Sequence, residues 1–234
     1  MEHHRHRHRR HRRRFTLPPR AVKILLALFA GVALLIAAPL AWFFVLPLPK
    51  TSGRIRLQGL AAPVTVERDD RGVPHIAAQS LGDLYLAQGY VTAQDRLWQM
   101  EMLRRVANGD VAEIAGPAAL PLDTDSRTLG LRVAAEAAVG RLPESQKHWI
   151  SAYTRGVNAF IEGRSATLPV EFKILGIKPR PWTEADSLAI GLHMFRTLST
   201  TWRDELLKTA LVQRIGAART AELLPTSSTF DHPP

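Results

Sequence analysis

Residues that could carry acid–base or metal chemistry are scattered along the 234-residue chain. Outside the N-terminal tail the histidines are His75, His148, His193 and His232, each far from the next. The sequence contains no G-x-S-x-G nucleophile elbow, phosphate-binding P-loop, H-E-x-x-H zinc motif or dinucleotide fingerprint. It also contains no cysteine, which excludes disulfides, thiolate catalysis and cysteine-ligated metals. Spacing alone therefore identifies no catalytic set.

Charged residues do gather in one apolar segment, GYVTAQDRLWQMEMLRR (89–105). The periodicity of its apolar positions belongs to an amphipathic helix predicted over 81–107. A charge on a half-buried helix needs a partner, because an unpaired buried charge is strongly destabilising. We expect a packing helix with ion pairs, and direct use in catalysis is the alternative. The charged residues in question are Asp95, Arg96, Glu101, Arg104 and Arg105.

The formal net charge of +10 is concentrated at the N-terminus. Residues 1–23 hold nine basic residues and one acidic residue, so 22 basic and 20 acidic residues remain for the rest. A nearly neutral body disfavours nucleic acid as a partner, because nucleic-acid binding needs a basic face. The segment HHRHRHRRHRRR (3–14) is best interpreted as a disordered flank that orients a membrane span. Attraction to anionic lipid, metal binding and RNA binding are the alternatives.

An uncharged run of 26 residues follows, from 24 to 49. It exceeds the ~20 residues that cross a bilayer core as a helix, whereas a signal peptide usually has an apolar core of about 7–15. We expect a single-pass anchor in the cytoplasmic (inner) membrane, with a cleaved signal peptide as the alternative. Pro39 should kink this span. The basic flank over 1–23 places the N-terminus in the cytoplasm, so the main domain is expected to be periplasmic or extracellular.

The remaining sequence predicts a linker, a hairpin and a series of helices. Residues 50–61 are polar and contain glycine, as expected for a linker. Alternating residues on either side of Asp69-Asp70-Arg71-Gly72 predict two short strands, and Thr183 with Asp186 resembles a capping box. Residues 226–234 are expected to be a loop. Beyond the helix already described, apolar spacing predicts helices over about 123–142, 143–163, 183–199, 204–215 and 217–224.

Five short motifs occur in one order over about 125 residues. They are VERDDRGVPHIAA (66–78), GYVTAQDRLWQMEMLRR (89–105), GDVAEIAG (109–116), AYTRGVNAF (152–160) and PVEFKILGIKPRPWTEADSLA (169–189). Together they resemble the N-terminal, or α-subunit, part of the penicillin acylase family, whose members are N-terminal-nucleophile amidohydrolases. The resemblance covers roughly residues 62–225.

The resemblance implies a catalytic group outside these motifs. In such enzymes the precursor cleaves itself, and the new N-terminal serine of the second subunit attacks the amide while its own α-amine acts as base through water. Backbone and Asn donors of that subunit hold the oxyanion. Ser227 and Ser228 have no family-like cleavage context, so we expect the nucleophile in a missing β-subunit encoded downstream. The whole enzyme would be a four-layer αββα sandwich; this part would be α+β and mainly helical, preceded by a transmembrane helix.

The same resemblance implies that this chain lines the acyl pocket. Counting onward from Asp186, the pocket positions fall on Phe195, Leu198 and Ser199, which share one helix face at i, i+3 and i+4. Side-chain bulk there would set which acyl group fits. The alternative is that these residues are simply core.

A calcium ion that bridges the subunits is the other implied feature. The count places its carboxylate ligand from this chain at Glu205. One carboxylate cannot complete the 6–8 oxygen ligands of Ca²⁺, so the others would come from the partner subunit. The alternative is a solvated Glu205 that pairs with Lys208. No organic cofactor is implied.

We therefore expect part of a precursor of an amidohydrolase that cleaves linear amides of small N-acylated substrates, of the β-lactam or acyl-homoserine-lactone type. The alternative from another class is a non-catalytic, membrane-tethered helical binding module derived from that scaffold. A basic RNA-binding protein is a third possibility, and it would depend on residues 1–14 alone.

Overall fold

The computed structural model describes residues 18–163, 168–199 and 201–225. The chain divides into two compact units, residues 1–48 and 49–234, which are considered separately. Ser227, Ser228 and His232 lie outside the described residues.

In the first unit, α1 spans Pro19–Leu40 and continues into a π-helical segment, η1, over Ala41–Val45. The apolar stretch Val22–Val45 has a mean hydropathy of 2.6 and is long enough to cross a membrane. An N-terminal signal sequence has the same character, so the helix is compatible with either expectation. Pro39 lies inside α1. It cannot donate a helical hydrogen bond, and the change to π-helical geometry begins two residues later.

The second unit is built on two long helices, α2 (Leu81–Asn108) and α6 (Glu144–Gly163). The Ser80 hydroxyl caps α2 by accepting from the Asp83 backbone N–H at 3.1 Å. Glycines allow the two helices to meet backbone to backbone: a Cβ added at Gly156 would lie 2.0 Å from the Leu86 carbonyl oxygen. The helix predicted over 81–107 is confirmed, as is the helix predicted over 143–163.

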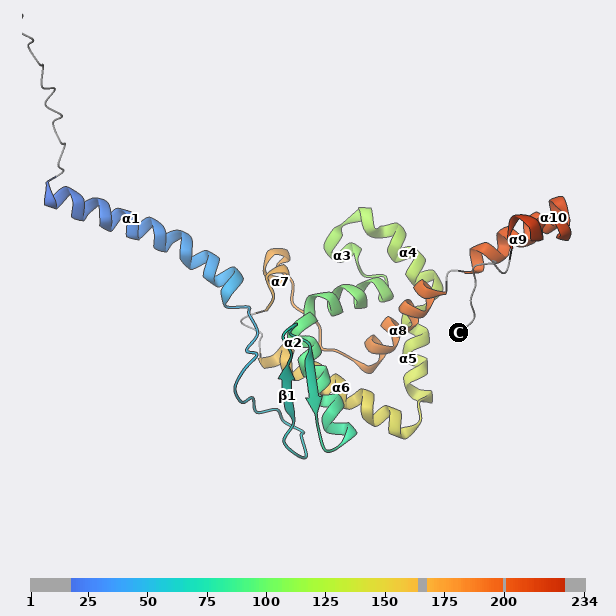
Figure 1. The fold of residues 1–234 in the computed structure, drawn as a ribbon, viewed down its shortest axis with the longest axis horizontal. Helices are drawn as coiled ribbons and strands as arrows, with labels where there is room; N and C mark the ends of the chain where they lie inside the picture. The colour runs from blue at the N-terminus through green and yellow to red at the C-terminus, as the bar shows by residue number, and fades with distance from the viewer. Residues whose placement is uncertain (1–17, 164–167, 200, 226–234) are drawn as a thin grey trace, which may run out of the picture. The chain divides into compact units, whose positions relative to one another are not determined.

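Of the shorter helices, α4, α5 and α8 lie against α2, whereas α9 and α10 extend away from it (Figure 1). The helix predicted over 123–142 is wrong in one respect, because Gly130 adopts a left-handed conformation (φ 65°) and divides it into two helices. The capping box at Thr183 is present and begins α8 as predicted. The bounds are α3 Ala112–Ala115, η2 Pro117–Ala119, α4 Leu120–Leu129, α5 Leu131–Arg141, α7 Val170–Leu175, α8 Glu184–Leu198, α9 Thr201–Ile215 and α10 Ala217–Leu223.

The predicted hairpin is also present. Strands β1 (Thr65–Arg68) and β2 (Pro74–Ala77) pair antiparallel, with Thr65 opposite Ala77. The Asp69 carboxylate stabilises the connecting turn by accepting from the backbone N–H groups of Arg71 and Val73, each at 2.9 Å. These are the two strands of the described residues. The mainly helical α+β character is thus observed, whereas the αββα sandwich of a complete enzyme stays a prediction.

The core lies where α2 and α6 meet the segment from 168 to 182. Two edge-to-face aromatic pairs contribute, Tyr90 with Phe160 and Trp98 with Phe172. The buried members of this cluster are Ala93, Leu97, Met100, Val157, Phe160, Leu168, Phe172 and Trp182. The core therefore fixes the segment that leads into α8.

Residues 50–61 are hydrogen-bonded to the rest of the second unit at two positions. The side-chain amide of Gln94 donates to the Lys50 carbonyl at 2.9 Å, and the backbone N–H of Ala61 donates to Asp83 at 2.8 Å. Both acceptor and donor side chains belong to α2. The segment expected to be a linker is therefore attached to α2 near both of its ends.

Candidate functional site

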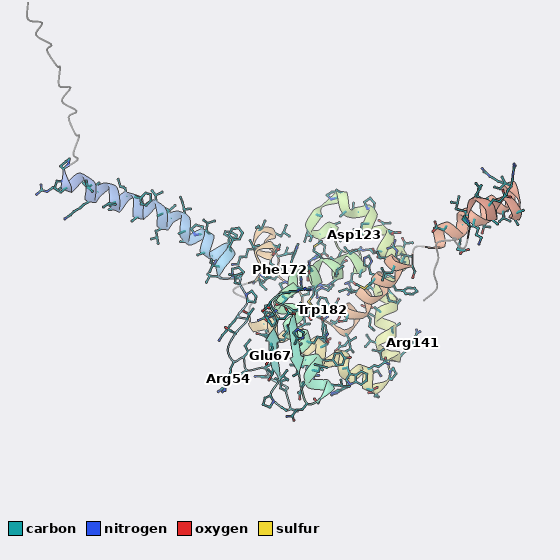
Figure 2. All side chains as sticks on the ribbon, viewed as in Figure 1. Arg54, Glu67, Asp123, Arg141, Phe172 and Trp182 are labelled. Carbon is teal, nitrogen blue, oxygen red and sulfur yellow. The ribbon has the colours of Figure 1, made fainter. Side chains whose placement is uncertain are left out.

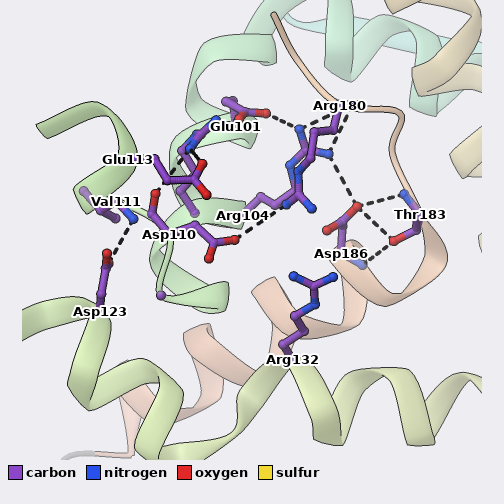
Figure 3. A network of polar contacts seen from close by, with 12 residues as sticks. Glu101, Arg104, Asp110, Val111, Glu113, Asp123, Arg132, Arg180, Thr183 and Asp186 are labelled. Carbon is purple, nitrogen blue, oxygen red and sulfur yellow. Dashed lines mark hydrogen bonds and ion pairs between the residues drawn. The ribbon is translucent and has the colours of Figure 1, made fainter. Parts of the chain in front are cut away.

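Glu101, Arg104 and Arg105, near the C-terminal end of α2, form a buried network of ion pairs, part of which Figure 3 shows. Glu101, which is 1% exposed, pairs with both Arg104 and Arg105, and its bond to the Arg105 Nε is 2.7 Å long. Nearer the start of the helix, Asp95 accepts two hydrogen bonds from Arg68, at 2.8 and 2.9 Å. The expectation of a packing helix with ion pairs is confirmed for these residues. Arg96 differs: it is exposed, and its backbone (φ −138°, ψ 20°) departs from helical geometry.

Arg104 is the centre of this network. Its guanidinium donates to the carbonyl oxygens of Arg180 and Pro181, at 3.3 Å each, and to the Asp186 carboxylate at 3.4 Å. It also lies over the Trp182 ring, 4.9 Å from the centroid. Although its Nε is buried without a partner, the side chain connects α2 to the loop that precedes α8. Arg104 therefore fixes where α8 begins.

Arg105 extends the network in the opposite direction. Its guanidinium donates to the Glu113 carboxylate at 2.7 Å and to the Asp110 carbonyl at 3.2 Å. Burial by itself would lower the pKa of Arg105, but Glu113 and Glu101 outweigh it and raise the pKa above its usual value. Both contacts hold the chain just beyond the C-terminus of α2. Arg105 therefore stays charged and stabilises the turn into α3.

A second contact fixes the loop before α8 from the side of α6. The Asn158 side chain accepts from the Trp182 backbone N–H at 2.7 Å and donates to the Trp182 carbonyl at 2.9 Å. Asp186 then accepts from the backbone N–H and the hydroxyl of Thr183, both at 2.9 Å. Sequence analysis assigned no role to Asn158, although it lies in the motif AYTRGVNAF. Its contact joins residues 24 positions apart, so no local pattern indicated it.

The predicted pocket residues gather at the C-terminal end of α8. Phe195 and Leu198 lie one turn apart and are 70% and 77% exposed. Ser199 follows as the C-cap, and its backbone N–H donates to the Phe195 carbonyl at 2.9 Å. Within this chain these side chains are not core, since most of their surface is accessible. They could form part of a wall only if further polypeptide or a ligand lay against them.

An apolar cleft of about 500 Å³ lies between α2, α6 and α8. Trp149 stacks on Tyr85 across it, with ring centroids 6.0 Å apart. Burial raises the pKa of Tyr153, which lines the same cleft. The cleft does not include Phe195, Leu198 or Ser199. The structure therefore places the predicted pocket residues outside this hollow.

Glu205 lies in α9 and is exposed. The ion pairs of the described residues do not include the predicted alternative, a pair between Glu205 and Lys208. No group of three potential metal-ligating side chains occurs in the described part of the chain. Glu205 thus presents an accessible carboxylate, and the other ligands of a calcium site would have to come from elsewhere.

The histidines do not form a catalytic pair in the described residues. His75 contacts Asp69 at 3.4 Å on an exposed hairpin. Burial, together with the nearby charge of Arg196, lowers the pKa of His193. Among the hydrogen bonds of the described residues, none joins a histidine to a serine hydroxyl. The arrangement thus supplies a scaffold and exposed apolar side chains.

Comparison with known proteins identifies the scaffold. A family model described as penicillin amidase matches residues 63–230. The chain is 39% identical over 176 residues to penicillin acylase 2 proenzyme of Pseudomonas sp. (strain SE83), and this match covers 75% of the chain and 22% of that protein. It is 36% identical over 179 residues to the acyl-homoserine lactone acylase QuiP of Pseudomonas aeruginosa, covering 76% of the chain and 21% of that protein.

A solved structure agrees with these matches. The chain is similar to a chain of the thermostable penicillin G acylase from Alcaligenes faecalis, with a TM-score of 0.59 and 30% identity. The match covers 74% of this chain and 96% of that one, whereas the chain spans about a fifth of the length of the curated relatives. The resemblance drawn from the five sequence motifs is confirmed, and the chain belongs to the penicillin amidase family.

Proposed function

We propose that this chain is the anchor and α-subunit-like part of an amidohydrolase that cleaves linear amides of N-acylated substrates. The substrate class would be β-lactam or acyl-homoserine lactone, since relatives of both names match the chain. The nucleophile would be the N-terminal serine of a second subunit, encoded beyond residue 234. Its hydroxyl would attack the amide carbon while the α-amine takes up the hydroxyl proton through water. The C–N bond would then break, the amine would leave with that proton, and water would hydrolyse the acyl-enzyme to release the acid and restore the serine hydroxyl.

The observation that carries the proposal is the exposed apolar end of α8. Phe195 and Leu198 together present two large apolar side chains to solvent at the positions that the family uses for the acyl pocket. Large exposed apolar side chains that lie together mark a binding surface. The start of α8 is fixed by buried polar contacts of Arg104 and Asn158. A rigidly held helix with an apolar end suits one wall of a pocket whose opposite wall belongs to the second subunit.

Glu205 would supply this chain's ligand to a structural calcium ion. The ion would contribute a fixed positive charge that joins the two subunits, and the remaining ligands would come from the partner. The helix Val22–Val45 would serve as a single-pass anchor in the inner membrane. The basic N-terminal flank would remain in the cytoplasm and the acylase domain would lie on the opposite side.

The direct test is to express residues 1–234 alone and together with the in-frame sequence that follows them in the genome. Hydrolysis of a chromogenic phenylacetyl amide and of N-acyl homoserine lactones is measured for both. We expect turnover only with the downstream sequence. Turnover by residues 1–234 alone would contradict the split site. No turnover on either substrate by a processed, two-subunit protein would refute the proposed substrate class. A genomic sequence without an in-frame second subunit would favour the non-catalytic binding module.

Substitution at the end of α8 tests the pocket role separately. Phe195→Ala should change the preference among acyl chain lengths by about tenfold or more, because one methylene in an apolar pocket is worth about 1–3 kcal/mol. Val133→Ala, at a residue of α5 that is 69% exposed against 70% for Phe195, is the matched control. Equal acyl preference in the two variants would remove Phe195 from the pocket.

A further inference from the structure

We propose that the segment 50–56, here called the basic strap, binds the anionic headgroups of the bilayer in which the chain is anchored. The partner is a phospholipid surface that contains phosphatidylglycerol or a similar anionic lipid. The inference rests on the proposal that Val22–Val45 spans a membrane, and the test below separates the two. It concerns neither the acyl pocket nor the calcium ligand.

The charge of the strap is uniform and uncompensated. Lys50, Arg54 and Arg56 are its three cations, and the sequence has no acidic residue between Glu2 and Glu67. All residues from 50 to 56 are exposed. The ion pairs found among the described residues include none of these three cations, whereas Arg68, Arg104, Arg105 and Arg127 of the same unit each have a carboxylate partner. Three free cations in a short exposed segment constitute an anion-binding surface.

The strap is held in place and is not a flexible tail. Its first residue accepts a hydrogen bond from Gln94 through the Lys50 carbonyl. Just beyond its last residue, the half-buried Leu57 and Leu60 line a small cavity of about 150 Å³ against β1 and α2. These contacts fix the backbone at both sides. In Figure 2 the Arg54 side chain points away from the ribbon.

The position of the strap in the sequence selects a lipid surface. Only residues 46–49 separate Lys50 from the last residue of the apolar helix. The cations therefore cannot lie far from the headgroups of a membrane that this helix spans. Ile55 lies between two of the arginines; it lines the cavity with part of its side chain, and its exposed part, 46%, can contact the interfacial region. An apolar residue flanked by arginines suits a lipid surface better than a nucleic-acid groove.

The expected effect is large enough to measure. Each basic residue near an anionic surface contributes about 1 kcal/mol, which is roughly a fivefold effect on a binding equilibrium. Three such residues give about a hundredfold preference for the lipid-bound strap at low ionic strength. Screening shortens the range of this attraction to about 8 Å at 0.15 M salt and about 3 Å at 1 M.

The absence of cysteine in the sequence makes a single labelling site available. The full chain with Ser52→Cys carries a spin label on the new cysteine. It is reconstituted in two kinds of nanodisc, one of phosphatidylcholine alone and one that also contains about 30% phosphatidylglycerol. We expect the label to lose mobility and gain contact with headgroups only in the anionic discs, and to recover mobility at 1 M salt. Replacing all three strap cations, K50Q, R54Q and R56Q, should abolish the effect.

Matched substitutions and an insertion assay complete the test. Arg141→Gln, Arg214→Gln and Arg219→Gln remove the same charge at exposed positions elsewhere and should leave the label response unchanged. Identical mobility in both lipids, or an anionic effect that persists without the strap cations, would refute the proposal. Extraction of the chain from vesicles by alkaline carbonate would instead refute the membrane span itself.

Discussion

Replacing Arg104 with methionine tests whether the buried network of α2 stabilises the fold. Methionine retains the length and apolar contacts of the side chain but removes the charge and its donors. Arg104 is 1% exposed and donates to two carboxylates and two backbone carbonyls. Its loss therefore leaves several buried acceptors with one partner fewer.

The magnitude follows from the partners that remain. Breaking a buried ion pair by removing one member costs about 3–5 kcal/mol. Here Glu101 keeps its 2.7 Å bond to Arg105, and Asp186 keeps both bonds from Thr183. Neither carboxylate is isolated, so we expect a loss of about 3 kcal/mol in the free energy of unfolding. Adding Glu101→Gln to Arg104→Met should cost less than the sum of the two single changes, because the two residues share one interaction.

Urea unfolding of the full chain in a nonionic detergent, followed by circular dichroism at 222 nm, measures this loss. The control is Arg68→Met. Arg68 donates two hydrogen bonds to Asp95, but these two side chains are 19% and 23% exposed. A partly solvated pair is worth about 1 kcal/mol at most. Equal destabilisation by Arg68→Met and Arg104→Met would refute the argument that burial makes the α2 network important.

Three further predictions use the same unfolding assay. Gly156→Ala should destabilise the fold by about 2 kcal/mol, because the added Cβ would lie 2.0 Å from a carbonyl oxygen of α2. Gly140→Ala is the control: open space surrounds this residue, so the change should stabilise the fold by up to about 1 kcal/mol. Similar effects of the two substitutions would contradict the close packing of α2 against α6. A backbone hydrogen bond lowers the pKa of the Asp83 carboxyl in the folded state. The contribution of this carboxylate to the free energy of unfolding is therefore complete above about pH 4 and is lost as the pH falls through the lowered pKa. Asp83→Asn should reduce this acid sensitivity, and an unchanged pH profile would contradict the prediction. Burial and the charge of Arg196 lower the pKa of His193 in the folded state. The free energy of unfolding should therefore fall as the pH drops below about 6.5, and His193→Gln should flatten that part of its pH dependence. An unchanged slope in the variant would exclude His193 as the source.

The long elements of the fold were predictable because their determinants are local. Periodic apolar positions and a capping box are read within a few residues, and they located α2, α6 and the start of α8. The break at Gly130 was missed because a glycine inside an alanine-rich segment is also compatible with a continuous helix. The short helices α3 and α7 have too few residues for a clear period.

The sequence indicated which charged residues need partners, but not which distant residues those partners are. The sequence indicated that Glu101 and the arginines of α2 need partners, and two of those pairs lie within one turn. The contact of Arg104 with Asp186 joins residues 82 positions apart, and that of Asn158 with Trp182 joins residues 24 apart. Such pairs depend on how the helices pack, which residue spacing does not specify.

At the end of α8 the apolar spacing is ambiguous, and the structure shows whether these side chains are buried or exposed. Apolar residues at i and i+3 on a helix are equally compatible with a core face and with a binding surface. In this chain the core ends with Trp182 and the first turns of α8, while Phe195 and Leu198 remain more than two-thirds exposed. Among the described residues, little of the surface of these two side chains is covered, although the start of their helix is held by buried contacts. This exposure is explained if a second polypeptide completes the surface, and the acyl-preference measurement on Phe195→Ala is the test of what that surface binds.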